Sequence, residues 1–229
     1  MTRFASSANR TSTRACWAAS SGSKTSIAPG APQELLTTCG RLLGSALGWP
    51  GSNPKDAEVF ERARTSVDLI LVVKGEDRRY HVGVGALSYF DPDFAIWAVK
   101  EDRPAVFYAG GVGLADKFDH GLADVLREVK RLGCLTFVDP VMPYNKTWHF
   151  LRKALRWTDI FHCNDVEALS LTRQKDLAAA VDFLLDSGPE LVLVSRGSKG
   201  LTAATRGRRL SMAGFKVRTL DPTGAGDAF

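Results

Sequence analysis

The sequence has 229 residues, of which 45% are hydrophobic and 24% are charged, an ordinary composition for a globular protein. A membrane-spanning helix is excluded, because no apolar run approaches the roughly 18–20 residues that one requires. A broad nucleic-acid surface is disfavoured as well. The net charge of +5 is concentrated in residues 1–33, which hold four basic residues and no acid and leave only +1 on the rest.

Residues 1–33 are rich in Ser, Thr, Ala and Arg and show no clear periodicity. Three interpretations stay open: a disordered leader, an organelle transit peptide, or translated sequence that is not truly coding. The first and third together are favoured over the second. We therefore expect a cytoplasmic protein, with an organelle as the alternative. Secretion is disfavoured because no apolar signal-peptide core is present.

The first regular elements are expected after residue 54. Residues 34–54 predict no firm element, whereas Lys55–Arg64 is a plausible helix. Val67–Val73 and Arg78–Val84 have the composition of strands, and the turn-like segment between them indicates a hairpin at about residues 65–85.

From residue 104 onward, strand-like and helix-like segments alternate. Strands are predicted at Ala105–Ala109, Leu135–Asp139, Asp159–Cys163 and Leu191–Ser195, and helices at Asp119–Arg131, Thr147–Trp157, Asp165–Leu171 and Gln174–Ser187. A hairpin of Gly200–Ala204 and Arg209–Ala213 follows. This order predicts an α/β domain with a parallel sheet covered by helices, whose ligands bind at the carboxyl ends of the strands.

The cysteines and histidines give no sign of a metal or dithiol site. None of the four cysteines belongs to a CxxC pair, and the four histidines have no ligand spacing. Cys134 and Cys163 lie in apolar, strand-like segments, so we predict reduced core residues there.

The last nine residues carry the strongest chemical signal. Gly224, Ala225 and Gly226 let successive backbone N–H groups turn toward one anion, and a helix beginning there would add its positive end. A carboxylate directly after such a site would repel the anion, unless it takes a proton from a hydroxyl that attacks a phosphate. Asp227 is therefore a candidate general base. The alternative is a Gly-rich turn with an ordinary acid at a helix start.

The full string DPTGAGDAF, residues 221–229, resembles the second signature of the ribokinase-like (PfkB-type) carbohydrate kinases, D-T-T-G-A-G-D-x-F. The resemblance implies a ribokinase-like α/β fold, with a mainly parallel sheet flanked by helices and a small β lid, to which the hairpin at 65–85 would correspond. It also implies ATP-dependent phosphorylation of a sugar hydroxyl. In this family, the amides of Gly224, Ala225 and Gly226 would form the anion hole and Asp227 would be the catalytic base.

Asn164 and Glu167 fit the N-x-x-E motif of the same family, which implies that they organise Mg²⁺ through water and phosphate. The same spacing is also that of a helix capping box, and both interpretations can hold together. Ser195, Gly197 and Gly200 resemble the family segment that contacts the nucleotide; a plain strand–turn–strand hairpin is the alternative.

The segment from Asp139 to Trp148 resembles the D-x-N-x-R-x-x-x-W region of sugar kinases, but it departs from that pattern. Val141 stands in the place of Asn and no Arg follows. Lys146 is a candidate for the missing charge, although a lysine lacks the forked donor geometry of arginine.

The resemblance covers roughly residues 65–229, and the first signature of the family is not recognisable. We expect a leader at 1–33 and a kinase domain at 34–229 that is incomplete at both ends, with low ATP affinity and little turnover. The implied cofactors are ATP and Mg²⁺, with a monovalent cation as an optional addition. The implied partners are a small sugar or nucleoside, with neither nucleic acid nor membrane, and a second copy in a homodimer is open. A nucleoside kinase of the same fold and a non-catalytic remnant are the alternative functions.

Overall fold

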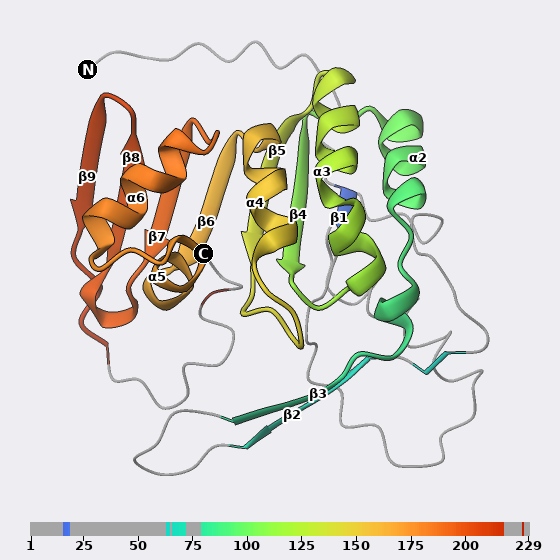
Figure 1. The fold of residues 1–229 in the computed structure, drawn as a ribbon, viewed down its shortest axis with the longest axis horizontal. Helices are drawn as coiled ribbons and strands as arrows, with labels where there is room; N and C mark the ends of the chain where they lie inside the picture. The colour runs from blue at the N-terminus through green and yellow to red at the C-terminus, as the bar shows by residue number, and fades with distance from the viewer. Residues whose placement is uncertain (1–15, 19–62, 65, 72–78, 218–225, 227–229) are drawn as a thin grey trace.

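The computed structural model describes residues 16–18, 63–64, 66–71, 79–217 and 226, and a seven-stranded sheet forms its centre (Figure 1). The strand order is β1-β4-β5-β6-β7-β8-β9. The first five strands run parallel to one another. β8 pairs antiparallel with β7, and β9 pairs antiparallel with β8. The strands are β1 (Cys16–Ala18), β4 (Val106–Val112), β5 (Leu135–Pro140), β6 (Ile160–Asn164), β7 (Leu191–Ser195), β8 (Leu201–Thr205) and β9 (Arg208–Met212).

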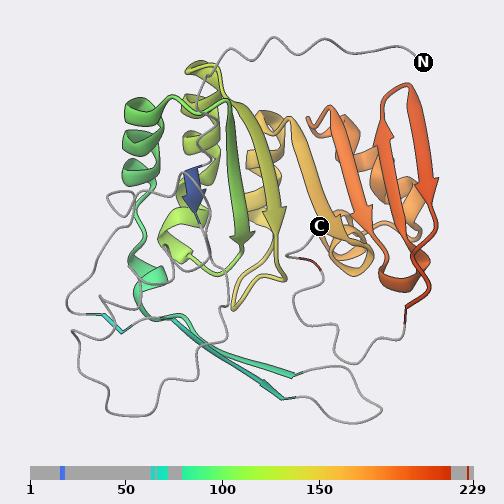
Figure 2. The same ribbon diagram turned by 180° about the vertical axis from the view of Figure 1, so that it is seen from behind.

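The helices from α2 to α6 lie on the same face of this sheet, as the two opposite views show (Figures 1 and 2). They are α2 (Pro92–Asp102), α3 (Asp116–Arg131), α4 (His149–Ala154), α5 (Asp165–Thr172) and α6 (Leu177–Asp186). Short 3₁₀ turns are η2 (Gly85–Tyr89), η3 (Leu155–Trp157) and η4 (Gly197–Lys199). The mainly parallel α/β sheet predicted from the sequence is thereby confirmed.

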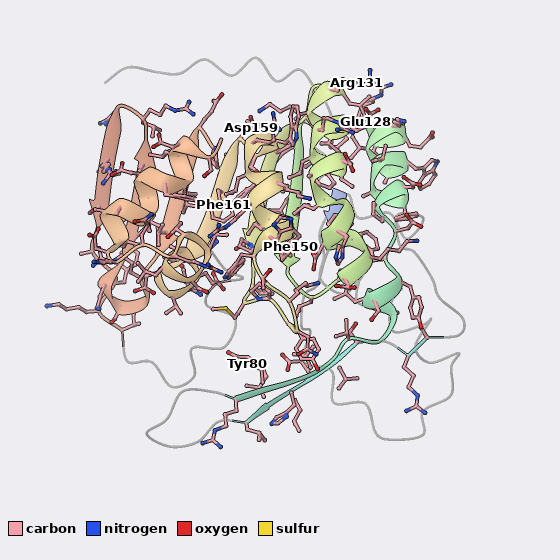
Figure 3. The ribbon with its side chains drawn as sticks, in the orientation of Figure 1. Tyr80, Glu128, Arg131, Phe150, Asp159 and Phe161 are labelled. Atoms are coloured by element: carbon pink, nitrogen blue, oxygen red, sulfur yellow. The ribbon has the colours of Figure 1, made fainter. Side chains whose placement is uncertain are left out.

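The core lies between the sheet and this helical layer. Alternate strand residues point toward the helices and are fully buried, among them Phe107 on β4, Val138 on β5 and Phe161 on β6. On α3 an apolar stripe meets them, formed by Leu122, Val125, Leu126 and Val129. Phe150 on α4 and Phe161 on β6 both belong to this core (Figure 3).

Two predictions about individual helices need correction. The predicted helix Thr147–Trp157 is α4 followed by the tighter turn η3. The predicted helix Gln174–Ser187 begins later, at Leu177, because the Asp176 side chain accepts the backbone N–H of Ala179 and caps the helix there.

Helix α2 was not predicted at all. Its start nevertheless carries ordinary signals: Asp91 accepts the N–H of Asp93, and Pro92 occupies the first turn. At the other end, Arg103 adopts a left-handed conformation with φ 47° and terminates the helix. Its buried side is made of small residues, Ala95, Ala98 and Val99, so its hydrophobic periodicity is weak.

The predicted hairpin is present as β2 (Val67–Leu71) paired antiparallel with β3 (Arg79–Gly83). It lies apart from the main sheet, next to the edge where the parallel strands end (Figures 1 and 2). Tyr80 stands on β3 of this hairpin and is half exposed (Figure 3). The predicted helix Lys55–Arg64 lies almost wholly outside the described residues, and its last two residues are not helical.

At the amino edge of the sheet, Asp159 joins two strands and a helix (Figure 3). Its carboxylate accepts the backbone N–H of Thr136 at 2.8 Å and the hydroxyl of the same residue at 2.9 Å, and it pairs with Lys130 of α3. Burial raises the pKa of Asp159, but these hydrogen bonds outweigh it, so the pKa is lowered overall.

Both cysteines that the structure describes with their side chains, Cys134 and Cys163, are buried free thiols as predicted, and burial raises the pKa of each. In the predicted leader, β1 pairs parallel with β4, a strand that the sequence pattern does not predict. The domain division at residue 33 falls outside the described residues and stays a prediction. None of the described helices is long and apolar enough to cross a membrane.

Candidate active site

The strands β4, β5, β6 and β7 end at one edge of the sheet, beside the β2–β3 hairpin (Figure 1). Because these strands are parallel, the polar residues at their carboxyl ends are brought together at that edge. The predicted residues Asn164 and Ser195 occupy paired positions there, at the ends of β6 and β7.

Asn164 and Glu167 form the predicted capping box at the start of α5. The side chain of Asn164 accepts the backbone N–H of Glu167 at 2.8 Å, and the Glu167 carboxylate accepts the backbone N–H of Asn164 at 2.8 Å. Asn164 has extended backbone angles, φ −87° and ψ 171°, as a capping residue requires. The capping interpretation is confirmed, and the metal role of these two residues remains a prediction.

Glu167 is electrostatically unusual. Only 9% of the residue is exposed, and burial, followed by the nearby charge of Asp139, raises its pKa to about 7, against the opposing effects of Asn164 and His162. At neutral pH this carboxyl is therefore close to half protonated. A cation nearby would restore its negative charge.

The residues at this edge fit an indirectly held magnesium ion better than a closed protein cage. Within the described part of the chain, no three His, Cys, Asp or Glu side chains are grouped so that they could hold a metal. Mg²⁺ usually keeps several waters and takes one or two carboxylates together with substrate phosphates. Glu167 supplies one such carboxylate at the carboxyl edge, with its second oxygen outside the capping box.

Three neighbouring strands contribute a hydrogen-bonded group beside Glu167. The Tyr108 hydroxyl on β4 donates to one carboxylate oxygen of Asp139 on β5, at 2.8 Å. The ring Nδ1–H of His162 on β6 donates to the other oxygen, at 2.9 Å. The sequence pattern placed Asp139 in a motif that departs from the sugar-kinase pattern, found no ligand spacing around His162, and did not single out Tyr108. Only the register between strands brings these three together.

Lys146, the candidate to replace the missing arginine, forms ion pairs with two acids of α3. Its ammonium lies 2.6 Å from Asp119 and 3.1 Å from Asp116, and 14% of its side chain is exposed. Asp119 also accepts the backbone N–H of Gly113 at 3.1 Å. Burial raises the pKa of Asp119 even though Lys146 lowers it. Lys146 therefore fastens the loop after β5 to the loop after β4.

The predicted nucleotide segment forms a tight turn between β7 and β8. The N–H of Arg196 donates to the carbonyl of Gly200 at 2.7 Å, and Gly197 has φ 54°. Gly200 has φ 91°, and a Cβ there would lie 1.9 Å from the carbonyl oxygen of Met212. Only glycine fits that position. The turn thus exists for a structural reason, and its contact with nucleotide stays a prediction.

Of the last signature, only Gly226 is described, in an exposed turn. Gly224, Ala225 and Asp227 lie outside the described residues. The anion hole and the general base are therefore still predictions from the sequence.

Comparison with known proteins settles the family. The model of the "pfkB family carbohydrate kinase" matches residues 56–229, about three quarters of the chain. The chain belongs to the pfkB family. The chain is also similar to Fructokinase-2 of Zea mays, with 31% identity over 206 residues, and to Fructokinase-2 of Oryza sativa subsp. japonica, with 25%. Each match covers 83% of this chain and 59% of the relative, so the chain spans less than two thirds of the length of these proteins.

Solved structures of ribokinases and of a nucleoside kinase show the same fold. The ribokinase of Giardia lamblia superposes with a TM-score of 0.70 at 18% identity, covering 85% of this chain and 61% of its own. The nucleoside kinase of Burkholderia thailandensis, in complex with inosine, gives 0.63 at 19%, covering 86% and 60%. A putative ribokinase II from E. coli, in complex with ATP and Mg²⁺, gives 0.60 at 21%, covering 72% and 55%.

The family assignment indicates where in this fold a ligand is expected to bind. In a pfkB kinase fold the ends of parallel strands are the expected ligand site. Here that edge carries the buried carboxyl of Glu167, the Tyr108–Asp139–His162 group and the turn after β7. The ribokinase-like fold inferred from nine residues at the end of the sequence is confirmed.

Proposed function

We propose that this chain carries the catalytic centre of an ATP-dependent carbohydrate kinase, which transfers the γ-phosphoryl group to a sugar hydroxyl. The observation that carries the proposal is Glu167, a buried carboxyl with a pKa of about 7, fixed by a capping box at the carboxyl edge of a pfkB-type sheet. Strongly shifted acids of this kind are enriched at catalytic sites.

The proposed roles follow the chemistry of phosphoryl transfer. Asp227 accepts the proton of the attacking sugar hydroxyl, whose oxygen forms the new bond to phosphorus while the bond to the β-phosphate oxygen breaks and ADP leaves. The amides of Gly224, Ala225 and Gly226 stabilise the negative charge of the group in transfer.

The nucleotide and metal would be held by the neighbouring elements. Ser195, Gly197 and Gly200 are proposed to contact ATP. Asn164 and Glu167 are proposed to orient the waters and phosphate oxygens around Mg²⁺, which neutralises charge on the transferring phosphates when bound. A monovalent cation remains an optional addition to this proposal.

A nucleoside kinase is the second candidate, supported by the similarity to a nucleoside kinase solved with inosine. The two activities share the phosphate chemistry and differ only in the acceptor. We further propose a cytoplasmic location, with an organelle as the alternative. A homodimer could use the exposed apolar side chains of the lid, Val67, Leu69 and Leu71.

The test is ADP release by the 229-residue chain with Mg²⁺ and ATP, measured with fructose, ribose and inosine as acceptors. Because low ATP affinity and little turnover are expected of this chain, we expect slow release that depends on a sugar and falls by about a hundredfold or more in Asp227→Asn. Asp186→Asn, which alters an exposed acid at the end of α6, is the matched control and should be unchanged. Dependence on inosine alone would favour the nucleoside kinase. A cooperatively folded chain with no acceptor-dependent release would support the non-catalytic remnant.

A further inference from the structure

The hydrogen-bonded group of Tyr108, Asp139 and His162 has no role in the proposed chemistry, yet it is built across three strands. Tyr108 pairs in register with Phe137, and Phe137 pairs with Ile160. Asp139 and His162 follow two residues later on β5 and β6, so all three side chains lie on the same side of the sheet. This is the side opposite the helical layer.

Asp139 is the centre of this group, because each of its two carboxylate oxygens receives one donor. Tyr108 supplies a hydroxyl from one side, and His162 supplies Nδ1–H from the other. The His162 side chain is 5% exposed and that of Asp139 is 20% exposed, so water competes little for the histidine bond. A carboxylate that accepts Nδ1–H fixes both the tautomer and the orientation of the ring.

The tyrosine itself is held in place. Its ring packs edge-on against Phe137, with centroids 5.1 Å apart. It also lies directly over Gly110, where an added Cβ would be 2.5 Å from the ring. Tyr108 therefore presents its hydroxyl to Asp139 from a fixed position.

The group reaches Glu167 through β6. His162 lies two residues before Asn164, whose backbone N–H binds the Glu167 carboxylate. The charges of Asp139 and His162 both act on Glu167, in opposite directions. A change in the orientation of His162 should therefore displace the end of β6, where the capping box begins.

We propose that Asp139 is a positioning residue. It orients His162, with Tyr108 as its fixed support, and thereby holds the end of β6. The Glu167 carboxylate is then correctly placed for a metal-bound phosphate. This inference rests on the proposed function of Glu167. Partners of this outer kind typically change metal affinity by about 10- to 100-fold when they are removed.

The test uses Asp139→Asn in the 229-residue chain, with Asp124→Asn as the matched control, because Asp124 pairs with Arg127 on the exposed side of α3. Two NMR signals report position independently of activity: the His162 ring Nδ1–H and the backbone N–H of Asn164. Asp139→Asn should shift both signals well beyond any shift in the control. Tyr108→Phe, which removes one hydroxyl and keeps the ring, should shift the Asn164 signal less than Asp139→Asn does.

Calorimetric titration with Mg²⁺ and ATP gives the second measurement, with an expected loss of affinity of about 10- to 100-fold in Asp139→Asn. An unchanged Asn164 amide in both folded variants would overturn the positioning role. So would a shifted amide with unaltered affinity. Absence of binding by the wild-type chain would instead contradict the proposed function, and the amide signals would still decide whether Asp139 positions Glu167.

Discussion

A lysine pairs with a buried aspartate at each edge of the sheet, and the two pairs behave in opposite ways. At the amino edge, Lys130 pairs with Asp159, whose pKa is lowered. At the carboxyl edge, Lys146 pairs with Asp119, whose pKa is raised because burial outweighs the lysine. The amino-edge lysine side chain is 41% exposed, whereas that of Lys146 is 14% exposed.

The difference lies in the neighbours of each acid. Asp159 accepts hydrogen bonds from the backbone N–H and the hydroxyl of Thr136. No neighbouring acid is among the described causes of its pKa shift. Asp119 has Asp116 nearby, and farther along the same edge Asp139 and Glu167 raise the density of acids. One edge stabilises the fold at neutral pH. The other concentrates negative charge that a bound cation would relieve, which is typical of a functional site.

The largest effect on stability is expected from removing the buried lysine. Lys146→Met leaves the buried Asp119 carboxylate without the positive charge of the lysine, and breaking a buried pair in this way costs about 3–5 kcal/mol. Lys130→Met, at the more exposed pair, should cost about 1 kcal/mol or less. Urea unfolding at pH 7.5 measures both. The cost of Lys146→Met should shrink as the pH falls, because Asp119 then protonates. Equal costs for the two variants would remove the contrast between the edges.

Glu167→Gln should stabilise the chain at high pH. Since the folded pKa is raised to about 7, the stability contributed by the neutral acid is complete below about pH 4.5 and is lost as the pH rises through 7. A shift of this size corresponds to about 3 kcal/mol. Glutamine does not titrate, so the variant should exceed the wild type by up to about 3 kcal/mol at pH 8 and match it at pH 4.5. If the stabilities of the two proteins changed in parallel with pH, the raised pKa of Glu167 would be contradicted.

Replacing a carboxylate by a carboxamide at the amino edge should instead destabilise the chain at neutral pH. Asp159→Asn loses charge-assisted hydrogen bonds, at a cost of about 2 kcal/mol near neutral pH. Because the pKa of Asp159 is lowered, its contribution is present above about pH 4 and disappears as the pH falls through the folded pKa. The difference between variant and wild type should therefore vanish in acid. A stabilising effect at pH 8 would show that the two edges do not differ as described.

The contrast between the edges also explains what the sequence could predict. Local patterns were sufficient for α3, whose apolar stripe has helical spacing, and for β7, whose predicted bounds are those observed. The capping box was predictable because its two residues are three positions apart. Helix α2 was missed because its buried side is made of small residues, although Asp91 and Pro92 mark its start.

Contacts between strands could not be predicted in this way. Tyr108 and Asp139 are 31 positions apart, and Asp139 and His162 are 23 apart. Their meeting depends on the register of three strands, which no local spacing encodes. The commitment of Lys146 to α3 depends likewise on how two loops meet above the sheet.

The smallest effect is expected from the side chains that cap two neighbouring helices, Asn164 within its capping box and Asp176 as a single cap. Asn164 caps α5 directly at the end of β6, where Glu167 is held, and Asp176 caps α6, which carries none of the proposed site residues; each does so through one side-chain bond to a backbone N–H. Replacement of either by Ala should cost about 1 kcal/mol, measured by thermal unfolding. Only Asn164→Ala should also weaken binding of Mg²⁺ and ATP, by about tenfold, because it loosens the turn that holds Glu167. Equal binding by both variants would mean that the capping box serves the fold alone.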